Sequence, residues 1–284
     1  DLLLVAVKAH HLAAAVEDLR GLVGERTIVL SLLNGVTSEA VLGERLQYVI
    51  VESHSQGVEA IEDGAELDIA VGAAARSARC DYAQFIGAGP DNAEAAASLA
   101  GKSAGLKMYL DSTFGELRLD DMTLWMPHFT NFPKHAPIVL HSESRTMAAG
   151  ILFAAIYDRP VHIAHISLKE EVLLIKAAKE RGIKVTCEVC PHHLFMVSQV
   201  TNEERGKKRE GRDEVRPRLA TQEDVDALWA NMDVIDCFAT DHAPHLKGEK
   251  EAEFDAAPPG IIGFETAFSL GYEQLVFGKT LPLA

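Results

Sequence analysis

The chain has 284 residues, a hydrophobic content of 48%, and 27 basic against 42 acidic residues, which give a formal net charge of -15. This length suffices for one large α/β barrel or two smaller domains, and the acidic balance argues against nucleic acid as a partner because it repels phosphates. Apolar runs end after about seven residues, so the sequence predicts no membrane span and no secretory signal. Four cysteines scattered through apolar segments are typical of reduced thiols in a cytoplasmic protein.

Short β-branched runs alternate with longer segments of helical period, which predicts βα units around a parallel sheet. In the first part of the chain, strands are expected at 2–7 and 27–32, within a β-α-β segment. From Cys80 onward six further strands are expected, at 82–87, 105–110, 137–141, 161–166, 184–189 and 234–240. The segment 167–180 has the period of an amphipathic helix. Six consecutive βα units are typical of a TIM-type (β/α)8 barrel.

Four of the predicted strands carry one potential metal-binding or acid–base residue at or near the carboxyl end: Lys107, His141, His165 and Asp241. In a barrel, side chains at these ends leave the packed interior and face the loops. Two neutral imidazoles and a carboxylate suit Zn²⁺, which lowers the pKa of a bound water to near 7. A lysine ammonium would repel the metal, so Lys107 fits this set only if it is carboxylated.

The strand at 161–166 contains two histidines, and strand alternation separates them. Period two places His165 on the face of Val161 and Ile163, and His162 on the opposite face. We therefore expect His165 in the site and a structural role for His162. The charged segment 203–214 has no periodicity and is expected to be a solvated loop.

Several motifs recur in a recognisable order. They are AGLKMYL (104–110), PIVLHSE (137–143), VHIAH (161–165), CEVCPHHL (187–194), EVRP (214–217), FATDHAPH (238–245), PPG (258–260) and GFET (263–266). Together they resemble dihydroorotase, an amidohydrolase, and in particular the dihydroorotase domain of the multifunctional animal-type pyrimidine-synthesis protein. The resemblance extends over about residues 76–284.

The resemblance implies a TIM-type barrel that interconverts N-carbamoyl-L-aspartate and dihydroorotate in pyrimidine biosynthesis. In this family a carboxylated lysine bridges two zinc ions, two histidines complete one site, and an aspartate binds the other metal and moves the proton. These places fall on Lys107, His141, His165 and Asp241. The family's substrate-binding positions fall on Arg216, His245, Pro259 and Gly260, and its mobile active-site loop falls on Thr113 and Phe114.

One family motif, a His-x-His-x-Arg on the first strand, has no counterpart here. No His-x-His occurs ahead of Lys107, where the nearest candidates are His10, His11 and His54. Adjacent strand residues point to opposite faces, so His10 and His11 do not replace such a pair. One metal position therefore keeps three protein ligands and the other keeps two. We expect one zinc where the family has two, and weak or absent activity.

Residues 1–73 resemble the cofactor domain of 2-dehydropantoate 2-reductase, with Lys8 and Asn34 at its cofactor-side and substrate-side positions. The Gly-x-Gly-x-x-Gly turn that binds a dinucleotide pyrophosphate does not occur in the sequence, so we expect no NADP site. Two partial resemblances in one chain are compatible with a fusion, an artificial sequence or an erroneous gene model.

We expect two segments, 1–75 and 76–284. In the favoured interpretation the first segment supplies strands in place of the first two barrel strands. In the competing one, it is a small α/β lobe beside an open six-stranded sheet with exposed edges. For function, the alternatives to a hydrolase are a non-catalytic dihydroorotase-like scaffold domain and an NADP-dependent reductase fragment. The expected partners are a small-molecule substrate and either further copies of the chain or a multienzyme pyrimidine-synthesis assembly.

Overall fold

The structure is a computed structural model of the chain, and it describes residues 2–5, 28–31, 50–52, 61–78, 81–112, 117–198, 210–271 and 273. The chain divides into two compact units. The first contains Asp1–Ser53, Asp68–Gln84 and Phe264–Ala284, and the second contains His54–Leu67 and Phe85–Gly263. Every predicted site residue that the structure describes lies in the second unit.

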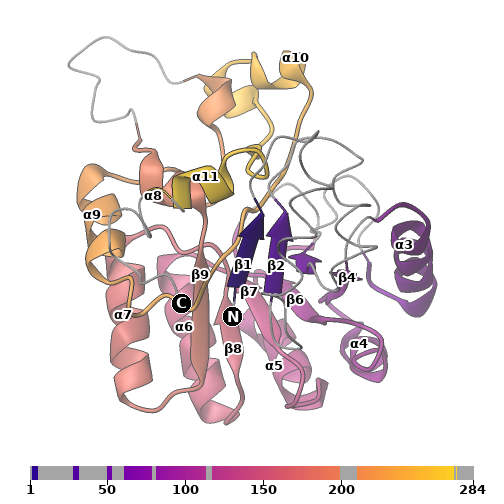
Figure 1. Cartoon of the computed structure of the whole chain (residues 1–284). Helices are drawn as coiled ribbons and strands as arrows, with labels where there is room; N and C mark the ends of the chain where they lie inside the picture. Colours follow the sequence, from indigo (N-terminus) through magenta and orange to yellow (C-terminus); the bar gives the residue numbers. More distant parts are fainter. Residues whose placement is uncertain are drawn as a thin grey trace. The chain divides into compact units, whose positions relative to one another are not determined.

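The second unit is built on a parallel sheet of six strands, whose order is β10-β9-β8-β7-β6-β5. Strands β6, β7, β8 and β9 are labelled in Figure 1. The strands are β5 (Phe85–Gly87), β6 (Gly105–Tyr109), β7 (Ile138–His141), β8 (Val161–Ile163), β9 (Val185–Val189) and β10 (Cys237–Phe238). Strands that follow one another along the chain are neighbours in the sheet, as successive βα units require.

Helices lie between the strands along the chain: α4 (Ala93–Ser98), α5 (Met122–Asn131), α6 (Ser144–Ile156), α7 (Lys169–Glu180), α8 (Pro191–Phe195) and α9 (Gln222–Ala230). Helix α7 confirms the amphipathic period of 167–180, because Val172 and Ile175 are buried on one side of it. Gly150 allows α6 to approach the sheet closely, since a Cβ at this position would lie 2.5 Å from the Cδ1 atom of Leu140. Within the described ranges, no helix is long and apolar enough to cross a membrane.

The two faces of the sheet differ in chemistry. The apolar positions of the strands belong to the same buried core as the apolar residues of the helices; these strand positions are Leu106, Met108, Ile138, Leu140, Val161, Ile163, Val185, Cys187 and Val189. The register aligns the intervening positions, pairing Lys107 with Val139, Val139 with His162, and His162 with Thr186. The second face therefore carries polar side chains from several strands. In a barrel this is the inner face, which leads to the mouth.

Two predicted strands differ from the structure. The run at 82–87 divides at Gln84 into β4 (Asp81–Ala83) and β5, and β4 pairs with β3 (Ile50–Glu52). The run at 234–240 is reduced to β10. The reason is that the backbone amides of Val234 and Ile235 donate to the carbonyls of Asn231 and Met232. These hydrogen bonds close a turn after α9, where the apolar sequence had suggested a strand.

The first unit contains two parallel strand pairs, β1 (Leu2–Val5) with β2 (Ile28–Ser31), and β3 with β4. The first pair confirms the two strands expected at 2–7 and 27–32. Helix α3 (Gly64–Ser77) contributes its residues from Asp68 onward, and the short helix α11 (Ala267–Gly271) also belongs to this unit. The division at residue 75 and the replacement of barrel strands stay predictions.

Candidate active site

The four residues predicted at strand ends occupy one edge of the six-stranded sheet. Lys107 lies within β6, His141 ends β7, His165 follows β8, and Asp241 follows β10. Lys107, His141 and His165 are almost fully buried, with exposed fractions of 4%, 2% and 2%. Because the strands are parallel, their carboxyl ends meet at the same edge, which is where barrel enzymes carry their active sites.

The two histidines are in direct contact. Nδ1 of His141 and Nε2 of His165 lie 2.8 Å apart, and the ring centroids are 4.6 Å apart in an edge-on arrangement. One ring nitrogen donates and the other accepts, so at least one of the two imidazoles is neutral. Tyr109 packs beside them, with its ring 5.7 Å from the ring of His141 and 5.6 Å from Nζ of Lys107.

Asp241 is electrostatically coupled to this cluster. Burial raises the pKa of its carboxyl group to about 6, with Lys107 opposing the rise and Glu188 adding to it. Burial also raises the pKa of Tyr109 to about 12, and the nearby Asp241 carboxylate contributes. A carboxyl group that titrates close to neutral pH can both accept and donate a proton, which is the property required of a general acid–base group.

The alternation argument for His165 was wrong, although His165 does reach the cluster. Val161 and Ile163 pack in the core shared with the helices, so strict alternation would have directed His165 there as well. Strand β8 ends at Ile163, and His165 adopts a left-handed backbone conformation with φ of 37°, which turns its side chain toward His141.

His162 lies on the same face of the sheet as Lys107, and its ring nitrogens are occupied. Its Nδ1 is 2.8 Å from the Thr186 hydroxyl, and its Nε2 is 3.1 Å from the Glu188 carboxylate. Glu188 is 4% exposed and was missed by the sequence argument. The sequence could have indicated Glu188, because Thr186 and Glu188 are polar positions that alternate with the buried apolar positions of β9.

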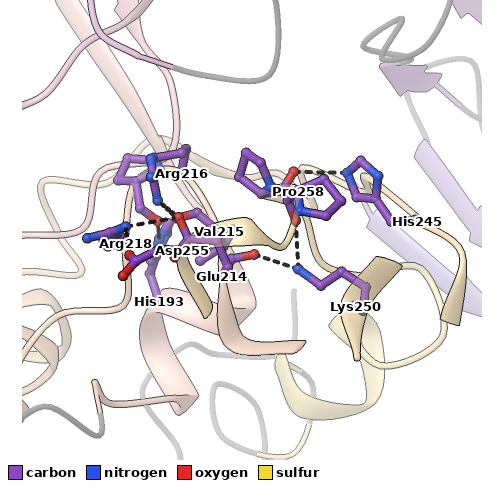
Figure 2. A network of polar contacts seen from close by, with 11 residues as sticks. His193, Glu214, Val215, Arg216, Arg218, His245, Lys250, Asp255 and Pro258 are labelled. Carbon is purple, nitrogen blue, oxygen red and sulfur yellow. Dashed lines mark hydrogen bonds and ion pairs between the residues drawn. The ribbon is translucent and has the colours of Figure 1, made fainter. Parts of the chain in front are cut away.

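The residues expected to hold substrate, Arg216, His245, Pro259 and Gly260, all lie in this unit, and Figure 2 labels Arg216 and His245. Arg216 contacts the carboxylate of Glu214, which is 2% exposed and also lies 3.3 Å from Arg218. The Arg216 guanidinium also influences Glu143, two residues after His141. Burial raises the pKa of Glu143 to about 7, Asp111 and Glu171 add to the rise, and Arg216 opposes it. Arg216 therefore lies within electrostatic reach of Glu143, and its membership of the same site as the histidines stays a prediction.

The Pro259–Gly260 turn is held by one side-chain contact and one backbone hydrogen bond. Nε2 of His245 lies 3.0 Å from the carbonyl oxygen of Pro259, and the Gly260 amide donates to the carbonyl of Glu214 at 3.0 Å. Gly260 has a φ of 155°, and a Cβ there would lie 2.5 Å from the Ala243 carbonyl oxygen. Glycine is therefore required at this position.

Other predicted residues lie outside the described ones. These are the loop residues Thr113 and Phe114, the histidines His10, His11 and His54, and the reductase-like positions Lys8 and Asn34. Their assignments stay predictions.

Comparison with known proteins separates the two parts of the chain. Residues 1–65 match the family model described as ketopantoate reductase PanE/ApbA. Multifunctional protein CAD of Squalus acanthias is 50% identical over 211 residues, which is 74% of this chain. The dihydroorotase of Caldicellulosiruptor saccharolyticus is 47% identical over 137 residues, or 48% of this chain. Most of the chain is related to dihydroorotases. It spans only 9% of the length of the first relative and 31% of the second.

Solved structures confirm the fold class. The L-hydantoinase of Arthrobacter aurescens matches with a TM-score of 0.70 and 20% identity, covering 87% of this chain and 62% of that one. The inactive dihydroorotase-like domain of a Chaetomium thermophilum CAD-like multifunctional protein matches with a TM-score of 0.66 and 24% identity, covering 98% and 73%. The chain therefore has the α/β fold of the TIM-type amidohydrolases, here with six strands of the parallel sheet described in the second unit.

Proposed function

We propose that this chain carries the active site of a zinc-dependent cyclic-amide hydrolase that interconverts N-carbamoyl-L-aspartate and dihydroorotate. The observation that carries the proposal is the gathering of His141, His165, Lys107 and Asp241 at one edge of the sheet, where the resemblance to dihydroorotase places the metal ligands. Similarity to multifunctional protein CAD over 74% of the chain, and to a dihydroorotase over 48% of it, supports the same reaction.

The donor set fits zinc. His141 and His165 would each supply an imidazole nitrogen, Asp241 would supply a carboxylate, and Lys107 would contribute an oxygen once carboxylated. Zinc bound there supplies a Lewis acid and lowers the pKa of water. The dihydroorotase family uses two zinc ions. Because this sequence has no His-x-His ahead of Lys107, we expect one, held mainly by His141 and His165.

The protein's own groups account for binding and proton transfer. The planar guanidinium of Arg216 is suited to bidentate hydrogen bonding with the substrate carboxylate. Its contact with the Glu214 carboxylate orients it for this role. In hydrolysis a water oxygen joins the ring carbonyl carbon, the C–N bond breaks, and Asp241 carries the proton of that water to the departing nitrogen. Ring closure reverses these steps. The raised pKa of Asp241 suits this transfer near neutral pH.

Two alternatives have specific support. The lack of a His-x-His pair favours a non-catalytic dihydroorotase-like scaffold domain, which needs no metal. The match of residues 1–65 to ketopantoate reductase favours an NADP-dependent reductase fragment. The hydrolase is preferred because its proposed site residues converge, whereas the reductase positions lack the glycine turn that binds pyrophosphate.

Two substitutions test the assigned roles. Asp241→Asn is expected to leave dihydroorotate binding within about twofold while removing turnover, because proton transfer fails but the carboxylate grip remains. Arg216→Ala is expected to weaken binding first. Calorimetry with dihydroorotate and a turnover assay in both directions measure the two effects. Equal behaviour of the two variants in binding and turnover would refute the roles. Zinc binding without any turnover would favour the scaffold.

The partners and compartment follow from this function. We propose that the chain acts on a small-molecule substrate, as a homo-oligomer or within a multienzyme assembly, as the relationship to the CAD protein supports. The free thiols of Cys187, Cys190 and Cys237 support a reducing compartment such as the cytoplasm.

A further inference from the structure

Lys250 ends helix α10 (Lys247–Lys250). Its ammonium group contacts two backbone segments that carry residues proposed to bind substrate (Figure 2). Nζ donates to the carbonyl oxygen of Glu214 at 2.8 Å and to that of Pro258 at 2.9 Å. Glu214 precedes Arg216 by two residues, and Pro258 opens the Pro258–Gly260 turn. One cation therefore links the arginine segment to the turn.

The same two segments meet at neighbouring atoms. The Glu214 carbonyl that accepts from Lys250 also accepts from the Gly260 amide at 3.0 Å. Both lone pairs of this oxygen are therefore used, one by an ammonium and one by the turn. Loss of Lys250 leaves the single Gly260 contact to hold the segments in register at this point.

The far end of the arginine segment is fixed from another element. Nε2 of His193, in α8, lies 3.0 Å from the carbonyl oxygen of Pro217 and donates to it. Arg216 thus lies between two anchored carbonyl groups, those of Glu214 and Pro217. Its side chain is held by the Glu214 carboxylate, so both the backbone and the guanidinium are oriented.

The environment of Lys250 suits this task. Its side chain is partly buried, and burial lowers its pKa while the Asp213 carboxylate opposes the change. Hydrogen bonds from a charged donor are stronger than neutral ones, and more so when they are shielded from water. Lys247, one turn earlier in α10, has a side chain that is 89% exposed, and it forms an ion pair with Glu251 at 3.5 Å on the surface.

We propose that Lys250 is a positioning residue that fastens the Arg216 segment to the Pro258–Gly260 turn and so sets the affinity for a carboxylate-bearing substrate. The fastening is a property of the fold. The effect on substrate rests on the proposed function.

The test compares Lys250→Met with Lys250→Arg and with the matched control Lys247→Met. Hydrogen exchange of the Gly260 and Arg216 amides measures the fastening, with the amides of β7 and β9 as the reference. In Lys250→Met we expect exchange at Gly260 to rise about tenfold while the strands stay unchanged, the size expected for one charge-assisted hydrogen bond. Lys250→Arg restores most of the protection because it keeps a charged donor of similar reach. Lys247→Met behaves as the unsubstituted chain.

Calorimetry with dihydroorotate and zinc analysis complete the test. Lys250→Met is expected to bind dihydroorotate about tenfold more weakly with an unchanged zinc content. Identical exchange in Lys250→Met and Lys247→Met would overturn the proposal. Faster exchange spread equally over β7 and β9 would also overturn it, since Lys250 would then stabilise the whole unit. If the unsubstituted chain does not bind dihydroorotate, the proposed function fails, while the exchange measurement still decides the fastening.

Discussion

Removal of the Glu171 carboxylate is expected to destabilise the fold and loosen the strand-end cluster together. Glu171 lies in the first turn of α7 and is 1% exposed. Its Oε1 accepts the Ser144 amide at 2.9 Å, and its Oε2 accepts the amides of Ser167 and Leu168 at 2.9 and 3.0 Å. Ser144 follows His141 by three residues and Ser167 follows His165 by two. One carboxylate therefore holds the two loops that position the histidines.

The expected loss in Glu171→Ala follows from these contacts. Hydrogen bonds to a charged acceptor contribute about 1.5–3 kcal/mol each, and three buried amides lose their partner. Burial raises the pKa of Glu171 against the opposing amides, so relief of the buried charge offsets part of the loss. We expect about 3–4 kcal/mol less free energy of unfolding, a large share of the roughly 5–15 kcal/mol typical of a domain.

Urea denaturation at pH 7.5 measures this loss. The matched control is Glu180→Ala, at the exposed carboxyl end of the same helix, where a change within about 0.5 kcal/mol is expected. A second readout is zinc affinity, which should fall in Glu171→Ala because the loops of His141 and His165 lose their shared anchor. A loss below about 1 kcal/mol with unchanged zinc affinity would refute the reasoning.

Two further predictions concern ligands of the whole chain. As purified, the protein should hold at most about one zinc per chain, measured by elemental analysis, because one metal position keeps three protein ligands and the other keeps two. Two tightly bound zinc ions with normal turnover would show that His10, His11, His54 or an unrecognised group replaces the missing pair. Titration with NADPH should show no saturable binding, since the glycine turn is lacking; a micromolar or tighter dissociation constant would revive the reductase hypothesis.

The parallel sheet could be predicted because each strand is a short β-branched run followed by a helical period. The failures share a cause. The runs at 82–87 and 234–240 have mostly apolar sequences, but their backbone hydrogen bonds depend on partners outside the runs. Asp81–Ala83 pairs with β3, and the Val234 amide closes a turn by donating to the Asn231 carbonyl. The hydrophobic period of a sequence indicates which residues are buried, but it does not indicate which backbone group each residue hydrogen-bonds to.

The site was predictable to the extent that strand ends define it. Lys107 and His141 lie within β6 and β7, so their positions follow from the strands themselves. Glu188 was recoverable from the polar alternation of β9. The contact of Glu171 with Ser144 was not recoverable, because Ser144 lies 27 residues away in the chain and offers only a backbone amide to this carboxylate. Contacts of side chains with distant backbone groups leave no pattern in the sequence.

Backbone strain gives support to the proposed roles that does not depend on motifs. Among the described residues, four non-glycine residues have positive φ: Ser144, Asp158, His165 and Asp241. Asp158 follows Tyr157, the C-cap of α6, where a left-handed residue commonly ends a helix. His165 and Asp241 instead follow strands β8 and β10, and their conformations cost about 1–2 kcal/mol each. Such a cost persists only where the surroundings hold the residue in place, and strained residues cluster at functional sites. Two of the four strained residues, His165 and Asp241, are those that the resemblance assigns to metal binding and proton transfer, so the backbone geometry supports that assignment independently of the motifs; the remaining one, Ser144, begins α6.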